Sequence, residues 1–214
     1  MLHIDYFTFN AFQENTYIIH NDEKQCWIVD PGMYDNSETE KLIAYLTKEQ
    51  LKPMGIINTH AHLDHIFGVQ AMIDTYHIPF SLHKKELPVL KQAMNAGALW
   101  GFPMASIPQP DHFIDEHQIM TLGSDTIHVK FTPGHSPGSV VFYYPAGKWA
   151  IGGDVLFARG IGRTDLPGGD HETLLNSIRT QLFVLPDEIT VFPGHGPATT
   201  IGQERLYNPF LNQR

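Results

Sequence analysis

The sequence of 214 residues contains a single cysteine, Cys26, so an intramolecular disulfide is excluded. A chain without disulfides agrees with a reducing compartment. The first twenty residues lack the basic segment and the unbroken apolar run of a secretion signal, and no later stretch is apolar for long enough to span a bilayer. We therefore expect a cytoplasmic protein that does not enter the membrane.

Positive charge is also scarce. The chain has 14 Lys and Arg residues against 23 Asp and Glu residues, which gives a net charge of −9, and no basic run occurs. Proteins that bind nucleic acids or anionic membranes do so through clusters of positive charge. Both partners are therefore excluded, and we expect a small-molecule substrate. The oligomeric state is left open by the sequence.

The apolar content of 42% is enough to bury one sizeable core, so residues 1–214 are predicted to form one domain. Short β-rich runs precede amphipathic helical segments, and this order occurs twice. The pattern predicts two β-sheets packed face to face with helices outside. Strands are predicted at 2–9, 16–20, 26–30, 54–58, 80–83, 119–122, 126–132, 139–144, 149–151 and 190–192, and helices at 37–51, 84–95, 172–185 and directly after His65.

Two local features carry further expectations. Ser37 and Glu40 have the spacing of a capping box at the start of the first helix. Residues 97–111 are rich in Gly and Pro and include Trp100 and Phe102, which predicts a long ordered loop that could cover a pocket as a lid.

Histidine is abundant, with 13 residues, and several of them occur in a pattern. The segment from His60 to His65, His-Ala-His-Leu-Asp-His, holds four potential metal ligands in six residues. Three more follow predicted strands: His135 after Thr-Pro-Gly, Asp154 after Ile-Gly-Gly, and His195 after Phe-Pro-Gly. Unrelated structural histidines have no reason to recur at strand ends. The pattern therefore predicts a metal centre.

Imidazoles together with carboxylates suit borderline divalent ions, zinc above all, with iron and manganese as alternatives. The two side chains of an extended His-x-His can point to one ion, while the Asp and His at the start of the following helix point to a neighbouring one. Two ions about 3.5–4 Å apart can share a hydroxide and activate it. The expected division is His60, His62 and His135 at the first ion, Asp64, His65 and His195 at the second, and Asp154 as the bridge.

These motifs resemble those of the metallo-β-lactamase superfamily, and within it the glyoxalase II-like (hydroxyacylglutathione hydrolase-like) enzymes. The resemblance extends from Asp30-Pro31-Gly32 through His195. It implies an α/β fold of four layers, the αββα sandwich, with the seven residues above as metal ligands. It further implies that Asp30 orients the ligands from behind.

Two features favour the glyoxalase II-like branch over true β-lactamases. The bridging position holds Asp154, where many β-lactamases have a cysteine, and the segment 153–163 is similar to that branch. In those enzymes a basic residue at the place of Arg163 approaches the glutathione part of the substrate. A tyrosine that they use nearby is absent here, since Thr164 and Asp165 occupy that segment.

The resulting prediction is hydrolysis of a thioester such as S-lactoylglutathione, by attack of the hydroxide shared by two metal ions, with Asp64 and Asp154 as catalytic residues. A thiol with a pKa near 8.5 leaves without much protonation. Three alternatives remain. His60, His135 and Asp154 alone could hold one iron in a persulfide dioxygenase, the hydrolase could act on a lactone or another small ester, or the centre could be a scaffold without catalysis.

Overall fold

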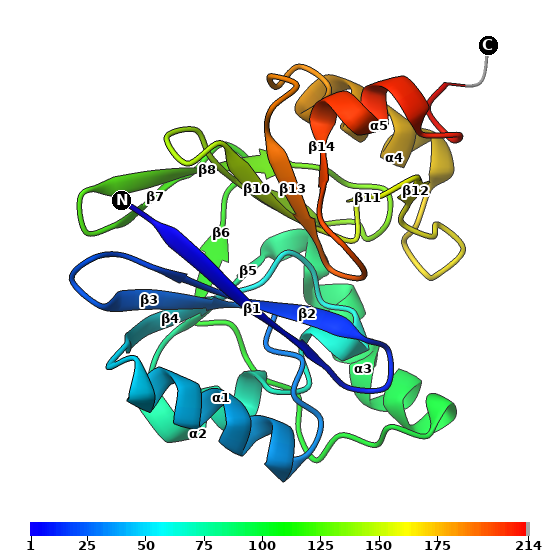
Figure 1. Cartoon of the computed structure of the whole chain (residues 1–214). Coiled ribbons are helices and arrows are strands. Elements are labelled where there is room, and N and C mark those ends of the chain that lie inside the picture. The colour runs from blue at the N-terminus through cyan, green and yellow to red at the C-terminus, as the bar shows by residue number, and fades with distance from the viewer. Residues whose placement is uncertain (213–214) are drawn as a thin grey trace.

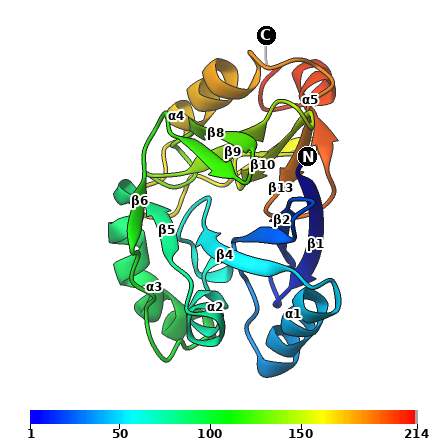
Figure 2. The same cartoon turned by 90° about the vertical axis from the view of Figure 1, so that its left-hand side faces the viewer.

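The structure is a computed structural model that describes residues 1–212. Two six-stranded β-sheets lie against each other, and helices cover the outer face of each (Figure 1). The view turned by 90° shows the two sheets between the two helical layers (Figure 2). This arrangement confirms the predicted αββα sandwich.

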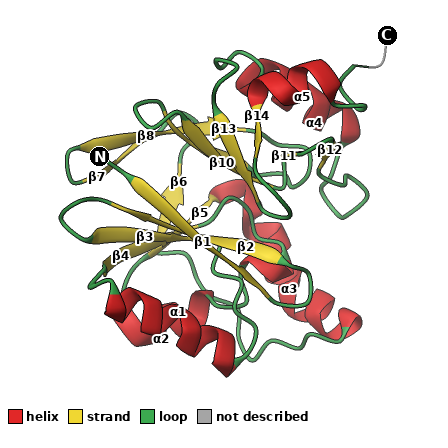
Figure 3. Cartoon of the chain, viewed as in Figure 1, coloured by secondary structure: helices red, strands yellow, loops and turns green. Residues whose placement is uncertain are grey.

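The first sheet has the strand order β1-β2-β3-β4-β5-β6. The pairs β1–β2 and β2–β3 are antiparallel, whereas the pairs from β3 to β6 are parallel and are connected through helices. Helices α1, α2 and α3 cover its outer face (Figure 3). The elements are β1 His3–Phe9, β2 Glu14–His20, β3 Gln25–Val29, α1 Asn36–Lys48, β4 Lys52–Ile57, α2 Val69–Tyr76, β5 Phe80–His83, α3 Leu87–Trp100 and β6 His112–Ile114.

The second sheet has the order β14-β13-β10-β9-β8-β7 and is antiparallel except for the pair β10 and β13. Helices α4 and α5 lie on its outer face (Figure 1). The elements are β7 Ile119–Leu122, β8 Asp125–Phe131, β9 Val140–Tyr144, β10 Trp149–Gly153, the hairpin of β11 Leu156–Phe157 and β12 Gly160–Ile161, α4 His171–Ser177, β13 Thr190–Pro193, β14 Thr199–Thr200 and α5 Ile201–Tyr207.

Three hydrophobic clusters separate the layers, and strand alternation explains them. On β2, Ile18 packs with α1, whereas Tyr17 and Ile19 face the space between the sheets. On β9, Phe142 faces that same inner space, and Val141 packs toward α4 and α5. Each central strand thus has apolar residues on both faces, as expected for a sheet covered on both sides.

The structure corrects the predicted start of the first helix. Asp35 caps α1, because its side chain accepts a hydrogen bond from the Glu38 amide at 2.9 Å. Ser37 lies inside the helix, and its hydroxyl donates to Asp35. A capping box of Ser37 and Glu40 is therefore wrong by two residues.

The predicted loop 97–111 is also shorter than expected, because α3 continues to Trp100. Gly97 is buried in the helix, where an added Cβ would collide with the backbone carbonyl of Phe102. Because Gly97 has no side chain, the segment that follows α3 can pack closely against the helix. The last predicted helix, 172–185, is divided into α4 and a π-helical turn, Ile178–Leu182.

Among residues 1–212, no helix is both long enough and apolar enough to cross a membrane.

Candidate metal centre and substrate cavity

All seven predicted ligands lie at one edge of the sandwich, because the strands that precede them end there. The strands β8 and β10 are both antiparallel to β9, so they share a direction, and β13 runs parallel to β10. Their carboxyl ends deliver His135, Asp154 and His195 to the same edge. The segment after β4 brings His60, His62, Asp64 and His65 from the first sheet.

The first predicted group is assembled in the structure. One ring nitrogen from each of His60, His62 and His135 lies within 4.8 Å of the other two. The Nδ1 of His62 lies 2.8 Å from the Nε2 of His135. His60 and His135 are buried, His62 is partly exposed, and both His62 and His135 border the cavity. Three nitrogen donors converge in this way on one position where an ion could bind.

The second predicted group is assembled beside the first. One ligand atom from each of Asp64, His65 and His195 lies within 4.8 Å of the other two. The Nε2 of His195 lies 3.1 Å from an Asp64 carboxylate oxygen, and the Nε2 of His65 lies 3.8 Å from that oxygen. His65 is provided by a single 3-10 turn, Leu63–His65, rather than by the start of the long helix that the sequence indicated.

Asp154 lies between the two groups. One carboxylate oxygen is 3.6 Å from the Nε2 of His135 and 3.5 Å from the Nε2 of His195. The other oxygen is 3.5 Å from the Nε2 of His65. The carboxylate therefore reaches one residue of the first group and two of the second, which is the placement that a bridging ligand requires.

Two histidines make hydrogen bonds on the side of the ring that faces away from the metal centre, and these bonds determine which ring nitrogen faces the centre. The Nδ1 of His135 lies 2.7 Å from the backbone carbonyl of Arg163, and the Nδ1 of His195 lies 3.0 Å from that of Phe12. A carbonyl oxygen only accepts, so both Nδ1 atoms carry hydrogen and donate. In the neutral rings, each Nε2 then keeps a lone pair that points inward and can bind a metal.

Asp30, which the family resemblance predicts to orient the ligands, contacts His65 and Thr59. Its Oδ1 accepts from the Thr59 amide at 2.7 Å, and its Oδ2 accepts from the Thr59 hydroxyl at 2.5 Å. The Nδ1 of His65 also donates to Oδ2, at 3.1 Å. Asp30 also falls within a third potential metal group with His60 and His65. Both of its oxygens already accept hydrogen bonds from Thr59, and Oδ2 also accepts one from His65.

Unsatisfied polar atoms show that the residues fit a metal. The buried Nε2 atoms of His60 and His65 and the buried Oδ1 of Asp154 have no hydrogen-bond partner. Buried polar atoms are almost always paired, since an unpaired one costs about 1–3 kcal/mol. The three atoms belong to the two groups and to the carboxylate between them, so bound cations would satisfy them.

Burial keeps two of the histidines in the neutral form that metal binding needs. Burial and the neighbouring His135 lower the pKa of His62 to about 3, and burial lowers the pKa of His60 well below its ordinary value. Both rings are therefore neutral at pH 7. Burial alone would raise the pKa of Asp154, but the adjacent His65 and His135 outweigh it and hold this pKa below the ordinary value.

Glu86 is a buried residue of this region that the sequence did not reveal. It precedes α3, and its carboxylate accepts hydrogen bonds from the amides of Ala61, at 2.8 Å, and Gly138, at 2.6 Å, and from the hydroxyl of Ser136. These partners flank ligands from both sheets. A glutamate in His-Lys-Lys-Glu has no sequence signal for such a role, because the contact depends on the tertiary fold.

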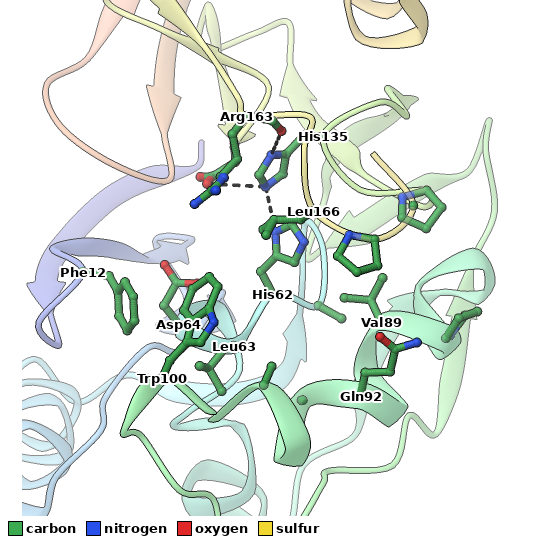
Figure 4. Close-up of a pocket in the computed structure, with 18 of the residues that line it drawn as sticks. Phe12, His62, Leu63, Asp64, Val89, Gln92, Trp100, His135, Arg163 and Leu166 are labelled. Atoms are coloured by element: carbon green, nitrogen blue, oxygen red, sulfur yellow. Dashed lines mark hydrogen bonds and ion pairs between the residues drawn. The ribbon is translucent and has the colours of Figure 1, made fainter. Parts of the chain in front are cut away.

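Five of the seven predicted ligands border a cavity of about 1010 Å³. His62, Asp64 and His135 face into it, and Arg163 lies beside His135 (Figure 4). The guanidinium of Arg163 is exposed and makes two hydrogen bonds to the carboxylate of Asp165, at 2.7 and 2.8 Å. The predicted substrate-binding arginine is thus at the cavity, but its charge is already paired.

A comparison with protein-family models finds that residues 9–195 match the family described as "Metallo-beta-lactamase superfamily". "Probable metallo-hydrolase YqgX" from Bacillus subtilis is 42% identical over 202 residues, which cover 94% of this chain and 93% of that protein. "Hydroxyacylglutathione hydrolase GloC" from Haemophilus influenzae is 37% identical over 215 residues and covers both chains completely.

Two solved structures are also similar to this chain in sequence and in fold. The one described as "Crystal structure of BLEG-1 B3 metallo-beta-lactamase" is 45% identical with a TM-score of 0.91, and the match covers 99% of this chain and 100% of that one. The one described as "Crystal structure of TTHA1623 in a di-iron-bound form" is 39% identical with a TM-score of 0.87, and the match covers 97% and 100%.

Proposed function

Since the chain belongs to the metallo-β-lactamase superfamily and is a metal-dependent hydrolase, we propose that it cleaves thioesters at a binuclear metal site. The observation that carries this proposal is the position of Asp154 between two complete groups of ligand side chains at the cavity. A single-metal enzyme would need only one of these groups.

In this proposal His60, His62 and His135 hold the first ion, Asp64, His65 and His195 hold the second, and Asp154 is shared by both. Divalent ions bound there would lower the pKa of water and polarise the scissile carbonyl. The protein contributes the orientation of each donor, through the Arg163 and Phe12 carbonyls and through Asp30. Asp64 borders the cavity, where its carboxylate can accept a hydrogen bond from the attacking water. Zinc is the ion that we favour, and the di-iron form of TTHA1623 makes iron the first alternative.

The ionisable residues of the cavity favour a thioester as the substrate, because its leaving group needs little protonation. The described residues that line the cavity include six ionisable side chains: His62, Asp64, His135, Asp154, Arg163 and His195. Five of these are proposed ligands, and Arg163 is paired with Asp165. No separate general acid is therefore present among them, and a thiolate needs less protonation on departure than an alkoxide or an amine. The name of the Haemophilus influenzae relative points to the same reaction class, and S-lactoylglutathione is its simplest test substrate.

A second candidate, hydrolysis of a β-lactam, is favoured by the 45% identity to the structure described as a B3 metallo-β-lactamase. The amine that departs from a β-lactam needs a proton, so the lack of a free acid in the cavity places this reaction second. A chromogenic cephalosporin assayed beside a thioester compares the two activities directly.

The deciding experiment is metal analysis of protein purified without added metal, followed by thioester assays on that sample. We expect two divalent ions per chain and turnover of an acyl thioester. His60→Ala should abolish turnover, whereas His117→Ala, an exposed histidine outside the site, should leave it unchanged. One iron per chain with oxygen uptake on glutathione persulfide would instead identify a dioxygenase, and turnover of lactones alone would change the substrate class.

A further inference from the structure

One wall of the cavity is formed by a single face of α3. Val89, Ala93, Ala96 and Trp100 are spaced three or four residues apart, so they share a helix face, and all of them line the cavity that contains the ligands. Figure 4 shows Val89 on α3 and Trp100 near Leu63 at the other end of this wall. The helix rises by about 1.5 Å per residue, so the face from Ala93 to Trp100 is about 10 Å long.

Most of this wall is hydrocarbon, although Gln92 and Asn95 of α3 also line the cavity, and its central residues are small. Ala93 and Ala96 leave room against the helix, while Leu166 and Pro167 line the cavity from the second half of the chain. At the open end, Trp100 is 43% exposed and its ring centroid lies 6.0 Å from that of Phe12. An apolar surface that continues into a reactive centre is typical of a binding surface for an apolar group.

The charges of the cavity oppose an anionic group in the same place. Arg163 is the only Lys or Arg among the described residues that line the cavity, and Asp165 already neutralises it. A substrate carboxylate lying along α3 would therefore lose hydration without gaining a cationic partner. The chemistry of this wall matches a chain of carbon and hydrogen.

We propose that the α3 face binds the acyl chain of the substrate, and that this acyl group is apolar and considerably longer than a lactoyl group. The inference rests on the proposed thioesterase activity. The common biological thiols carry charged groups, so the hydrocarbon of a thioester lies on its acyl side. The scissile carbonyl lies at the metal ligands, the acyl chain extends past Ala93 and Ala96 toward Trp100, and the thiol portion leaves through the opposite, solvent-exposed side near Arg163.

The first test compares acetyl and octanoyl thioesters of one uncharged thiol, N-acetylcysteamine, with the metal-loaded enzyme. We expect kcat/KM to be about tenfold or more higher for the octanoyl thioester, since each buried methylene strengthens binding several-fold when fully enclosed. Equal kcat/KM values for the two substrates would overturn the inference, and a preference for the acetyl thioester would do so as well.

A pair of variants on the same helix locates the effect. Ala96→Leu fills the groove and should reduce kcat/KM about tenfold for the octanoyl thioester but less than twofold for the acetyl thioester. Ala98→Leu is the matched control, because Ala98 is exposed on α3 and does not line the cavity. A loss of octanoyl preference in Ala98→Leu, or an unchanged preference in Ala96→Leu, would contradict the placement.

A binding measurement separates this inference from the proposed activity. Calorimetry of the metal-loaded protein with octanoate and with acetate needs no turnover. Tighter binding of octanoate than of acetate, weakened by Ala96→Leu, would support the apolar acyl site. This support does not depend on turnover, so a failure to hydrolyse any thioester would then overturn only the proposed function. Octanoate binding no tighter than acetate binding would overturn the acyl site, whether or not thioesters are hydrolysed.

Discussion

The carboxylate of Glu86 accepts a hydrogen bond from the backbone amide of Ala61 at 2.8 Å, so an acid in the turn between β5 and α3 holds the residue between His60 and His62. The same carboxylate accepts from Ser136 and Gly138, which follow His135. Glu86 therefore links a ligand segment of the first sheet to a ligand turn of the second, although it lies in neither predicted metal group.

Replacing Glu86 by Gln should loosen both ligand segments. The amide group of Gln presents a donor where three donors now converge, so at least one buried hydrogen bond is lost, at a cost of about 1–3 kcal/mol. We expect metal affinity to decrease about 10–100-fold, as for other residues that orient ligands. Competition with a chromophoric chelator measures the affinity, and Glu116→Gln, which replaces a glutamate at the surface, is the control. Unchanged affinity in Glu86→Gln would show that the link is dispensable.

Gly153 is the second position where a small change should affect the ligands. Its φ is +49°, and an added Cβ would collide with the Thr59 side chain, which donates to Asp30. Gly153→Ala should therefore destabilise the protein by about 1–3 kcal/mol and weaken metal binding. Gly101→Ala isolates the backbone effect, since Gly101 also has a positive φ but nothing lies near its Cβ position. Urea unfolding of both variants makes the comparison, and equal losses would argue against the collision.

Metal removal should lower the thermal stability. A ligand present at about 100 times its dissociation constant stabilises the native state by roughly 2.7 kcal/mol, which for a chain of this size is about 5–10 °C in Tm. We expect a decrease of this size after chelation and dialysis, and its reversal when the metal is restored. Identical Tm values for loaded and stripped protein would mean that the centre does not contribute to folding.

Cys26 should be inert in the native protein. The thiol is fully buried on β3, and burial raises its pKa to about 12, so roughly one thiol in 10,000 is ionised at pH 8. Ellman's reagent should label no cysteine in the native protein within minutes and one per chain in guanidinium chloride. Rapid stoichiometric labelling without denaturant would indicate that β3 opens readily.

Asp165 should limit the use of anionic thiol carriers, because it neutralises Arg163 at the cavity. Asp165→Asn should raise kcat/KM about two- to fivefold for octanoyl-glutathione relative to octanoyl-N-acetylcysteamine, as expected for one exposed ion pair. In the double variant with Arg163→Ala, that gain should disappear. A gain that survives in the double variant would come from another source.

The sequence predicts the αββα layers, which the structure confirms, and it singles out seven side chains that the structure brings together at one edge, because both predictions depend on local patterns. Alternation of apolar residues marks each strand, and Gly or Pro marks its end, so a His or Asp after such a turn can be placed at a sheet edge. The residues that support the ligands are different. Glu86 and the Phe12 carbonyl act through long-range contacts, and no local pattern identifies them.

Helix boundaries are also difficult to predict from the sequence, because they too depend on long-range contacts. Gly97 lies inside α3, although the sequence predicts that this helix ends at residue 95. The glycine is there because it lets Phe102 approach the helix closely, and this contact cannot be recognised from local sequence. The sequence does not predict the short β14 and α5, since a strand of two residues and a helix of seven carry little periodicity of their own. The extra turn of α3 matters most, because it brings Trp100 to the cavity.

The division of the ligands between two sheets has a consequence for how this fold can diversify. Neither half of the chain contains a complete centre, so a duplicated or transplanted half would arrive without function. At the opposite ends of the strands, the hairpin between β7 and β8 contributes no ligand. Insertions there leave the catalytic edge intact, whereas each residue added after β4, β8, β10 or β13 shifts a donor atom. New specificities are therefore expected to arise from α3 and the loops that face it, while the ligand turns retain their length.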